Sequence, residues 1–325
     1  VYNMGVANRI AETYEKVSNR QTGPKDIGLV REFINDHFMG VVLFLPLLVL
    51  GGLVVLPLGY LLYSSVHQTG RYVQGTQFVG LENYIQAFND PMFWMTLQHS
   101  TLYAVGSVVI AFLLGLISAL AINQLRNKRL RSTFTVLILL AWAVPLVVTG
   151  LIWRFILDAN YGIANAFLIQ AGLITESVGF ITSSTPAFLA IIVVDAWARA
   201  PFATIILLAG LQTIPKDLYE AARIDGATDF QMFKDITLPH LKPSAGVALL
   251  IMSMFAFRTF SVVFALTQGG PSNATEVLAT YIYRTGIGQG RLGYAAALSV
   301  IMILITLVFV TLYVKRIQQE ALDTA

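Results

Sequence analysis

The chain has 325 residues, of which 56% are hydrophobic and only 12% are charged, and its mean hydropathy is +0.69. Soluble domains carry about 25% charged residues, and a chain of this length cannot bury so much apolar surface by folding on itself in water. We therefore expect a membrane protein. The net charge of +3 is too small to indicate a nucleic-acid-binding protein, and the absence of cysteine excludes disulfides and thiol catalysis.

The first 38 residues carry apolar side chains at helical spacing, from Val6, Ile10 and Val17 to Ile27 and Val30. We expect a cytoplasmic amphipathic segment. It can lie along the membrane surface or pack as a helix against the rest of the protein, and the sequence leaves both possibilities open.

Six later stretches are long and apolar enough to cross a bilayer, which takes about 20 residues. They predict an all-α, polytopic membrane protein with a transmembrane domain over residues 39–314 and a cytoplasmic tail over residues 315–325. Pro145 is expected to kink the third span. The predicted spans are Met39–Tyr63, Thr101–Ile122, Phe134–Leu157, Pro186–Gly210, Ser244–Thr267 and Gly293–Val314.

The basic residues between these spans predict the orientation of the chain. Fifteen Lys and Arg residues lie on one side, in the leading segment, in the connections after the second and fourth spans, and after the sixth span. The other side holds three: Arg71, Arg284 and Arg291. We therefore expect both termini on the cytoplasmic side of the inner membrane of a prokaryote.

The connection after the fourth span is unusually long and has helical patterns of its own. It runs over residues 214–243 as IPKDLYEAARIDGATDFQMFKDITLPHLKP. Pro215 suits the first turn of a helix, and Gly226 offers the left-handed conformation that ends one. A loop of this length is more often functional than a simple connection.

A second short helix is predicted after Gly226. Thr228 and Gln231 have the spacing of a capping box, and Pro239 is expected to end this helix. Two short helices beneath a membrane bundle suit docking into a cleft of another protein. The alternative is a hairpin at the membrane interface that only links two spans.

The same loop carries a known signature. Glu220, Ala221 and Ala222, then Gly226 after three residues and Ile236–Pro239 after nine more, reproduce the EAA motif. In this the chain resembles the inner-membrane permease subunits of binding-protein-dependent ABC importers.

Three further motifs resemble the carbohydrate-uptake branch of that family, specifically the first permease of the maltose and glycerol-3-phosphate type. They are Phe78–Tyr84 after the first span, Gly269–Pro271 after the fifth, and Gly293–Ala297 at the start of the sixth. The resemblance covers the chain from about Met39 onward. Some maltose permeases have two extra spans and a large external insertion, which this sequence lacks.

The resemblance implies a type I importer permease fold in which residues 214–243 form coupling helices that insert into a cytosolic ATPase subunit. Glu220 would pair with a basic residue of the ATPase, and Gly226 would form the turn between the helices. The other residues implied in this contact are Ala221, Ala222, Asp225, Phe230, Leu238 and Pro239.

The resemblance also implies partners: a second permease in a heterodimer, two copies of the ATPase, and an external sugar-binding protein. ATP and Mg²⁺ would be bound by the ATPase subunits. This chain has no G-x-x-x-x-G-K-[ST] phosphate loop, so we expect no cofactor and no enzyme activity of its own. Its four histidines are scattered and predict no metal site.

Polar residues inside the spans are candidates for a substrate pathway, because a charge there usually lines a cavity or has a partner. Asp195 and Arg199 are one helical turn apart and can pair, and Trp197 offers a flat surface for a sugar ring. A purely structural ion pair is the alternative. The remaining candidates are Phe255, Arg258, Tyr294 and Ser299.

The leading hypothesis is a sugar-importing permease that forms half of a translocation path and is driven by a separate ATPase. One alternative is an ion-coupled secondary carrier acting alone, which would need internal repeats and broken helices around an ion site. Another is a non-transport scaffold for assembling membrane proteins. The sequence does not identify the sugar or sugar phosphate.

Overall fold

The computed structural model describes residues 40, 42–44, 46–71 and 75–323, which fall into two units, residues 1–60 and 61–325. In the first unit the described residues are helical, with a π-helical turn η2 (Gly51–Val55) followed by the start of α3 (Leu56–Ser65). Their apolar side chains are exposed, as befits part of a membrane span. The predicted amphipathic segment over residues 1–38 lies outside the described residues.

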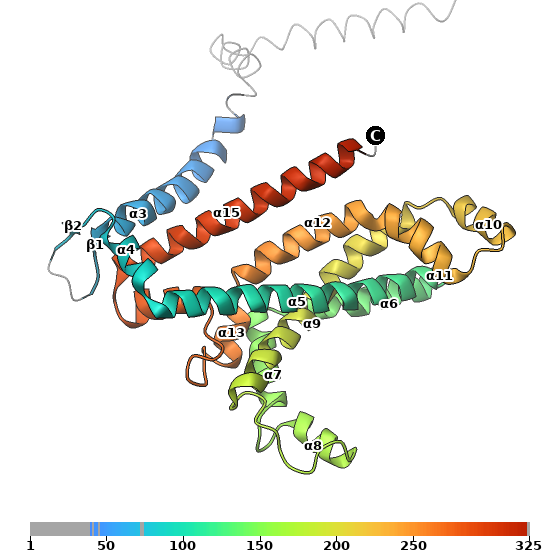
Figure 1. The fold of residues 1–325 in the computed structure, drawn as a ribbon, viewed down its shortest axis with the longest axis horizontal. Helices are drawn as coiled ribbons and strands as arrows, with labels where there is room; N and C mark the ends of the chain where they lie inside the picture. Colours follow the sequence, from blue (N-terminus) through green and yellow to red (C-terminus); the bar gives the residue numbers. More distant parts are fainter. Residues whose placement is uncertain (1–39, 41, 45, 72–74, 324–325) are drawn as a thin grey trace, which may run out of the picture. The chain divides into compact units, whose positions relative to one another are not determined.

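The second unit consists of helices and one small antiparallel hairpin, in which His67 pairs with Phe78 (Figure 1). The hairpin is formed by β1 (His67–Gln68) and β2 (Gln77–Phe78). The helices are α4 (Glu82–Asn89), α5 (Pro91–Gln124), α6 (Lys128–Ala143), α7 (Leu146–Ile156), α8 (Ile163–Gln170), α9 (Ser184–Gln212), α10 (Lys216–Ile224), α11 (Asp229–Met232), η3 (Phe233–Thr237), α12 (Leu238–Phe257), α13 (Ser261–Leu266), α14 (Leu278–Tyr283), η4 (Arg284–Gly288) and α15 (Leu292–Asp323).

The predicted all-α membrane fold is confirmed. Five helices of the described chain are long and apolar enough to cross a membrane, and α6 with α7 makes a sixth span if the bent pair is counted as one. The bend expected at Pro145 is present, but it is sharper than a kink: α6 and α7 meet at an angle of 91°, so the third span is two helices. Pro145 has no N–H to continue the helix and forces Val144 into an extended conformation, with ψ of 125°.

The fifth span also differs from the prediction of one helix over Ser244–Thr267. Its helix begins earlier, at Asp229, and ends at Phe257. Residues 258–260 interrupt it before α13 begins at Ser261.

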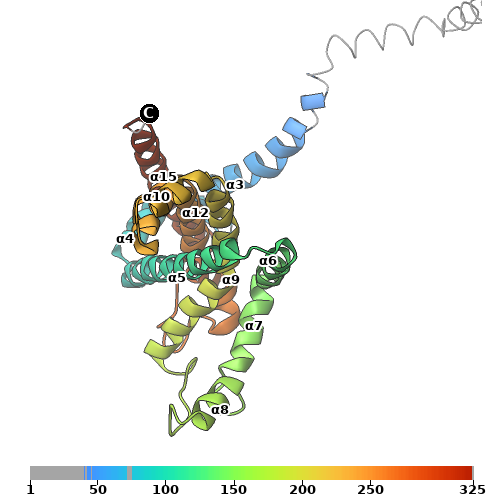
Figure 2. The same cartoon turned by 90° about the vertical axis from the view of Figure 1, so that its right-hand side faces the viewer.

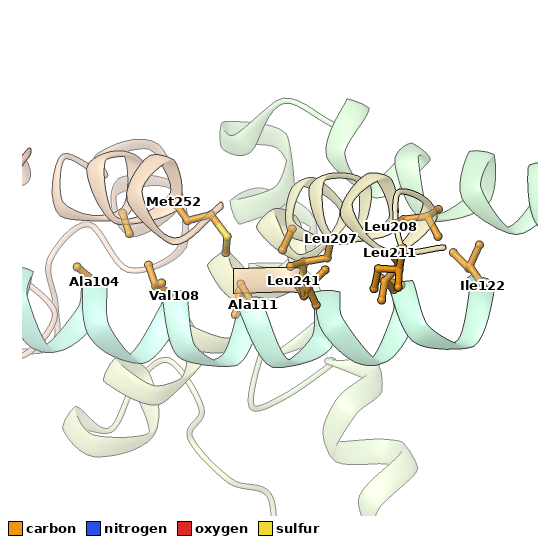
Figure 3. Packing of buried hydrophobic residues seen from close by; sticks show 14 residues of the cluster. Ala104, Val108, Ala111, Ile122, Leu207, Leu208, Leu211, Leu241 and Met252 are labelled. Atoms are coloured by element: carbon orange, nitrogen blue, oxygen red, sulfur yellow. The ribbon is translucent and has the colours of Figure 1, made fainter. Parts of the chain in front are cut away.

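The centre of the unit is the packing of α5 against α9 and α12. Gly115 of α5 lies so close to α9 that a Cβ atom on it would come within 2.5 Å of the Ala203 Cβ. Small residues allow such close approach, which drives association in lipid, where burial of apolar surface adds little. Figure 3 shows side chains from the three helices in this core: Ala104, Val108, Ala111, Ile122, Leu207, Leu208, Leu211, Leu241 and Met252.

The helix α5 connects two ends of this unit, and both figures show its course (Figures 1 and 2). We call the end with the α5–α6 turn, α10 and α11 the loop end. The other end, with β1, β2, α4 and α14, is the hairpin end. At 34 residues α5 is about 51 Å long, which exceeds the ~30 Å hydrocarbon core of a bilayer.

Candidate functional site

The first helix of the loop between α9 and α12 is α10, and its boundaries follow from local chemistry. Pro215 precedes it as the N-cap residue, one position earlier than predicted, and Asp217 in the first turn suits the helix dipole. Gly226 ends it with φ of +82°. The Gly226 N–H donates to the Arg223 carbonyl at 3.1 Å, and the Ala227 N–H donates to the Ala222 carbonyl at 2.9 Å. This is a Schellman motif, and it confirms the predicted turn.

The second helix begins with the predicted capping box. The Thr228 N–H donates to Gln231 Oε1 at 2.8 Å, and the Gln231 N–H donates to Thr228 Oγ1 at 3.3 Å. The predicted start of this helix is thereby confirmed.

The expectation that Pro239 ends the second helix is wrong. The chain stays helical from Asp229 to Phe257, passing through the π-turn η3. In that turn the Leu238 N–H donates to the Phe233 carbonyl, five residues earlier. The π-turn already interrupts the regular α-helical hydrogen-bond pattern, and Pro239, which has no N–H, is accommodated directly after it.

A side-chain hydrogen bond fixes α10 on the helix that follows. The Tyr219 hydroxyl lies 2.9 Å from Thr237 Oγ1, and Thr237 is only 5% exposed. Met232, the last residue of α11, is also buried. The loop is therefore a bent, anchored element rather than an extended connection.

The outer surface of this element is apolar at several points. Ile224 is 87% exposed and Phe230 is 73% exposed. Large apolar side chains exposed at two points of a short polar loop suit a contact with another protein. Of the residues predicted to couple to a partner, Ala222 is half-buried, while the others are exposed: Glu220, Ala221, Asp225, Gly226, Phe230, Leu238 and Pro239.

A second polar group lies inside the helices. Arg199 Nε is 2.7 Å from Asp195 Oδ2, and the Ser107 hydroxyl of α5 donates to the same oxygen. Asp195 is fully buried and Arg199 is 9% exposed. The pair predicted from the sequence therefore forms, and it ties α9 to α5. Ser107 was not predicted as a partner, because no charge or motif marks it within its apolar span.

The aromatic candidates flank this pair. The Arg199 guanidinium carbon lies 6.0 Å from the centre of the Phe255 ring. Trp197 is 39% exposed and packs edge-on against Trp153, with ring centres 5.7 Å apart. Arg258 lies at the end of α12, exposed, and donates through Nε to the Met254 carbonyl at 3.4 Å.

The two hydroxyl candidates on α15 have partners of their own. Tyr294 is 3% exposed and donates to Asp90 Oδ2 at 2.8 Å, while Ser299 donates to the Ala295 carbonyl at 2.8 Å. The Tyr281 hydroxyl donates to the same Asp90 oxygen at 2.5 Å. Partial burial raises the pKa of Asp90, but the tyrosine hydrogen bonds outweigh it and hold this pKa below its usual value.

This Asp90 cluster was missed by the sequence reasoning. Asp90 directly precedes Pro91 and its side chain accepts from the Met92 N–H at 2.9 Å, which is an N-cap signal that the sequence does show. Among the described residues no group of three or more metal-ligating side chains was found.

Comparison with known proteins defines the class of this chain. Residues 111–319, more than half of the chain, match the family described as "Binding-protein-dependent transport system inner membrane component". The chain belongs to this family and is a permease subunit of an ABC transport system.

Its relatives match over nearly their full length. The trehalose/maltose transport system permease protein MalF of Thermococcus litoralis is 35% identical over 278 residues, which is 85% of this chain and 92% of the relative. The sulfoquinovosyl glycerol transport system permease protein SmoG of Agrobacterium fabrum is 35% identical over 290 residues, 88% of this chain and 92% of the relative.

Solved structures agree on the fold. A chain of a bacterial ABC transporter involved in the import of the acidic polysaccharide alginate superposes with a TM-score of 0.76 at 24% identity, covering 89% of this chain and 98% of that one. A chain of a bacterial alginate ABC transporter in complex with an alginate pentasaccharide-bound periplasmic protein gives a TM-score of 0.73 at 25% identity, with coverages of 87% and 94%. The predicted importer permease fold is confirmed.

Proposed function

We propose that this permease imports a carbohydrate, and that it receives mechanical work from a separate ATPase through the loop over residues 214–243. The names of the two relatives, a trehalose/maltose and a sulfoquinovosyl glycerol permease, support the substrate class. The observation that carries the coupling role is the exposed Ile224 and Phe230 on an anchored, bent loop.

The loop end would face the cytoplasm, with both termini on that side, since it holds the excess of basic residues. Two ATPase subunits, which bind ATP and Mg²⁺, would dock there, one on this chain and one on a second permease in a heterodimer. A sugar-binding protein would deliver substrate at the hairpin end. A periplasmic protein accompanies the related alginate transporter, which supports this arrangement.

In this mechanism ATP binding closes the ATPase dimer and displaces α10. The Tyr219–Thr237 hydrogen bond ties that displacement to the helix that runs from Asp229 to Phe257. The spans of the two permeases would rock so that the path opens outward and accepts the sugar, and ATP hydrolysis would reset the cycle. Gly226 would form the turn that lets α10 project, with Ala221, Asp225 and the neighbouring exposed residues in contact with the ATPase.

The substrate path would run beside the Asp195–Arg199 pair. Phe255 and Trp197 supply aromatic surface of the kind that packs against sugar rings. Arg258 is exposed at the end of α12 and is free to donate to sugar hydroxyls. Tyr294 and Ser299 would support the path from α15 by holding helices in place rather than by touching sugar, since their hydroxyls are already hydrogen-bonded.

The test is the variant Glu220→Ala in the co-expressed transporter. Loss of one charge-assisted hydrogen bond at an interface is worth about 1.5–3 kcal/mol, so we expect uptake to fall roughly 10- to 100-fold and substrate to stop stimulating ATP hydrolysis. Asp235→Ala is the matched control, because it removes an exposed carboxylate of η3 from one of the nine positions that the EAA motif leaves unspecified. Uptake within twofold of wild type in Glu220→Ala would contradict the coupling role.

Purification separates this function from that of a carrier acting alone. Affinity purification of this chain from native membranes should also recover an ATPase and a second permease. Transport of a sugar by the purified single chain in vesicles, without ATP, would instead establish the ion-coupled carrier.

A further inference from the structure

A large cleft opens at the loop end, between the α5–α6 turn and the helices of the loop. Its volume is about 1110 Å³. Leu120 and Asn123 of α5, Lys128 of α6, Tyr219 of α10 and Phe233 of η3 all line it. Tyr219, Glu220 and Thr237, which the proposed coupling mechanism uses, form one wall of this cleft, whereas the residues of the α5–α6 turn that form the other wall have no role in that mechanism.

The cleft is strongly basic. Its two carboxylates are Glu220 and Asp229. Within the described part of the chain no lining carboxylate lies within 4.0 Å of any of the lining cations, so the positive charge is not neutralised by ion pairs. Five lining residues are cationic: Arg126, Lys128, Arg131, Lys216 and Arg223.

Two details show that the cleft is built for an anion rather than merely rimmed by solvated charges. Arg131, one of the lining cations, is held in place because its Nη2 donates to the Asn123 carbonyl at 2.8 Å. The 16-residue helix α6 begins at the cleft with no acidic residue in its first turn. Its N-terminal dipole therefore adds positive potential there.

The position of the cleft selects the source of that anion. Ile122 is the last apolar residue of α5, and the helix ends two residues later, at Gln124. Arg126 and Lys128 therefore lie where the hydrocarbon core of the bilayer gives way to the headgroups, and basic pockets between spans at that depth bind anionic headgroups. We propose that this cleft binds the phosphate headgroup of an anionic phospholipid.

The test uses the purified transporter complex and native mass spectrometry to titrate phosphatidylglycerol against phosphatidylcholine. The variant Arg126→Gln/Lys128→Gln removes two exposed cations that line the cleft. The control Arg129→Gln/Lys242→Gln removes the same charge from exposed positions at the same end that do not line the cleft. Melting temperatures and yields of both variants confirm that the complex is folded.

We expect wild type and control to retain phosphatidylglycerol in preference to phosphatidylcholine, and the cleft variant to bind phosphatidylglycerol about 10- to 30-fold more weakly, since each cation near a membrane surface contributes about a factor of five. Equal weakening in the control would overturn the proposal in favour of diffuse surface charge. Loss of the ATPase from the cleft variant with lipid retained would make the cleft a protein contact. Displacement of the lipid by millimolar inorganic phosphate would make it a site for free phosphate. Because this readout is lipid binding, it is independent of whether Glu220 couples to an ATPase.

Discussion

The Asp195–Arg199 pair gives a direct test of what holds α9 against α5. Asp195 accepts from Arg199 Nε at 2.7 Å and from the Ser107 hydroxyl, and both members of the pair are buried. The variant Asp195→Leu removes the carboxylate and leaves the guanidinium buried without a counter-charge.

The expected magnitude follows from that burial. Removing one partner of a buried ion pair costs about 3–5 kcal/mol, because the remaining charge stays desolvated. Replacing both partners by apolar residues often leaves the free energy of unfolding unchanged. The double variant Asp195→Leu/Arg199→Met should therefore recover most of the stability that Asp195→Leu loses. The Arg199 guanidinium also lies near the Phe255 ring, and a cation–π contact of about 0.5–2 kcal/mol would not be recovered.

The assay is SDS-induced unfolding in mixed micelles, followed by tryptophan fluorescence, alongside transport by the assembled complex. A structural pair predicts that the double variant recovers both stability and transport. A pathway role predicts recovered stability without recovered transport. If Asp195→Leu costs less than about 1 kcal/mol, the reasoning about a desolvated, uncompensated guanidinium is refuted.

Three further predictions test individual positions. Gly115→Leu should push α5 away from α9 and lower the free energy of unfolding by more than the roughly 1–3 kcal/mol of ordinary overpacking. Gly59→Leu is the control, because a side chain at Gly59 meets no atom within 4 Å and should leave the stability unchanged. Equal melting temperatures of the two variants would contradict this reasoning. Gly226→Ala has open space but a positive φ, so it should cost about 1 kcal/mol locally and weaken uptake while the complex still assembles on gel filtration. Burial raises the pKa of Glu276 above its usual value, and the positive charge of Arg284 opposes this rise only in part. The protonated Glu276 therefore contributes stability at low pH, and this contribution is lost as the pH rises through the raised pKa. In the variant Glu276→Gln the melting temperature should therefore fall less than in wild type between about pH 4.5 and neutral pH. If the melting temperatures of variant and wild type fall in parallel, Glu276 is not the group responsible.

Local chemistry in the loop was predictable from the sequence because each signal there acts over one helical turn. Gly226 ends α10 because its backbone reaches a conformation that other residues avoid, and Thr228 with Gln231 starts α11 through reciprocal hydrogen bonds. The Asp195–Arg199 pair was equally local, since its two members lie on one face of one helix. The roles of these residues toward partners remain predictions.

Features that depend on neighbouring helices were not predictable in the same way. Hydropathy averaged over a span measures whether a stretch can lie in lipid, and it does not mark the residues at which a helix breaks, such as Val144 and residues 258–260. The rule that proline ends a helix failed at Pro239, which directly follows a π-turn where the regular hydrogen-bond pattern of the helix is already interrupted. The Asp90–Tyr281–Tyr294 cluster joins Asp90 to residues 191 and 204 positions later, with several helices between them.

The failure at Pro239 matters for the proposed mechanism, because it makes the loop and the fifth span one mechanical element. A helix that stopped at Pro239 would leave a hinge between the docking surface and the membrane. The continuous helix of 29 residues from Asp229 to Phe257 is instead about 44 Å long. It carries Thr237, which holds α10, near one end, and Met252 and Ala256 of the α5–α9–α12 core near the other. The loop is therefore joined to the core beside Phe255 by one continuous helix, which contains the π-turn η3, Pro239 and Pro243, and the first break in that helix lies at residues 258–260.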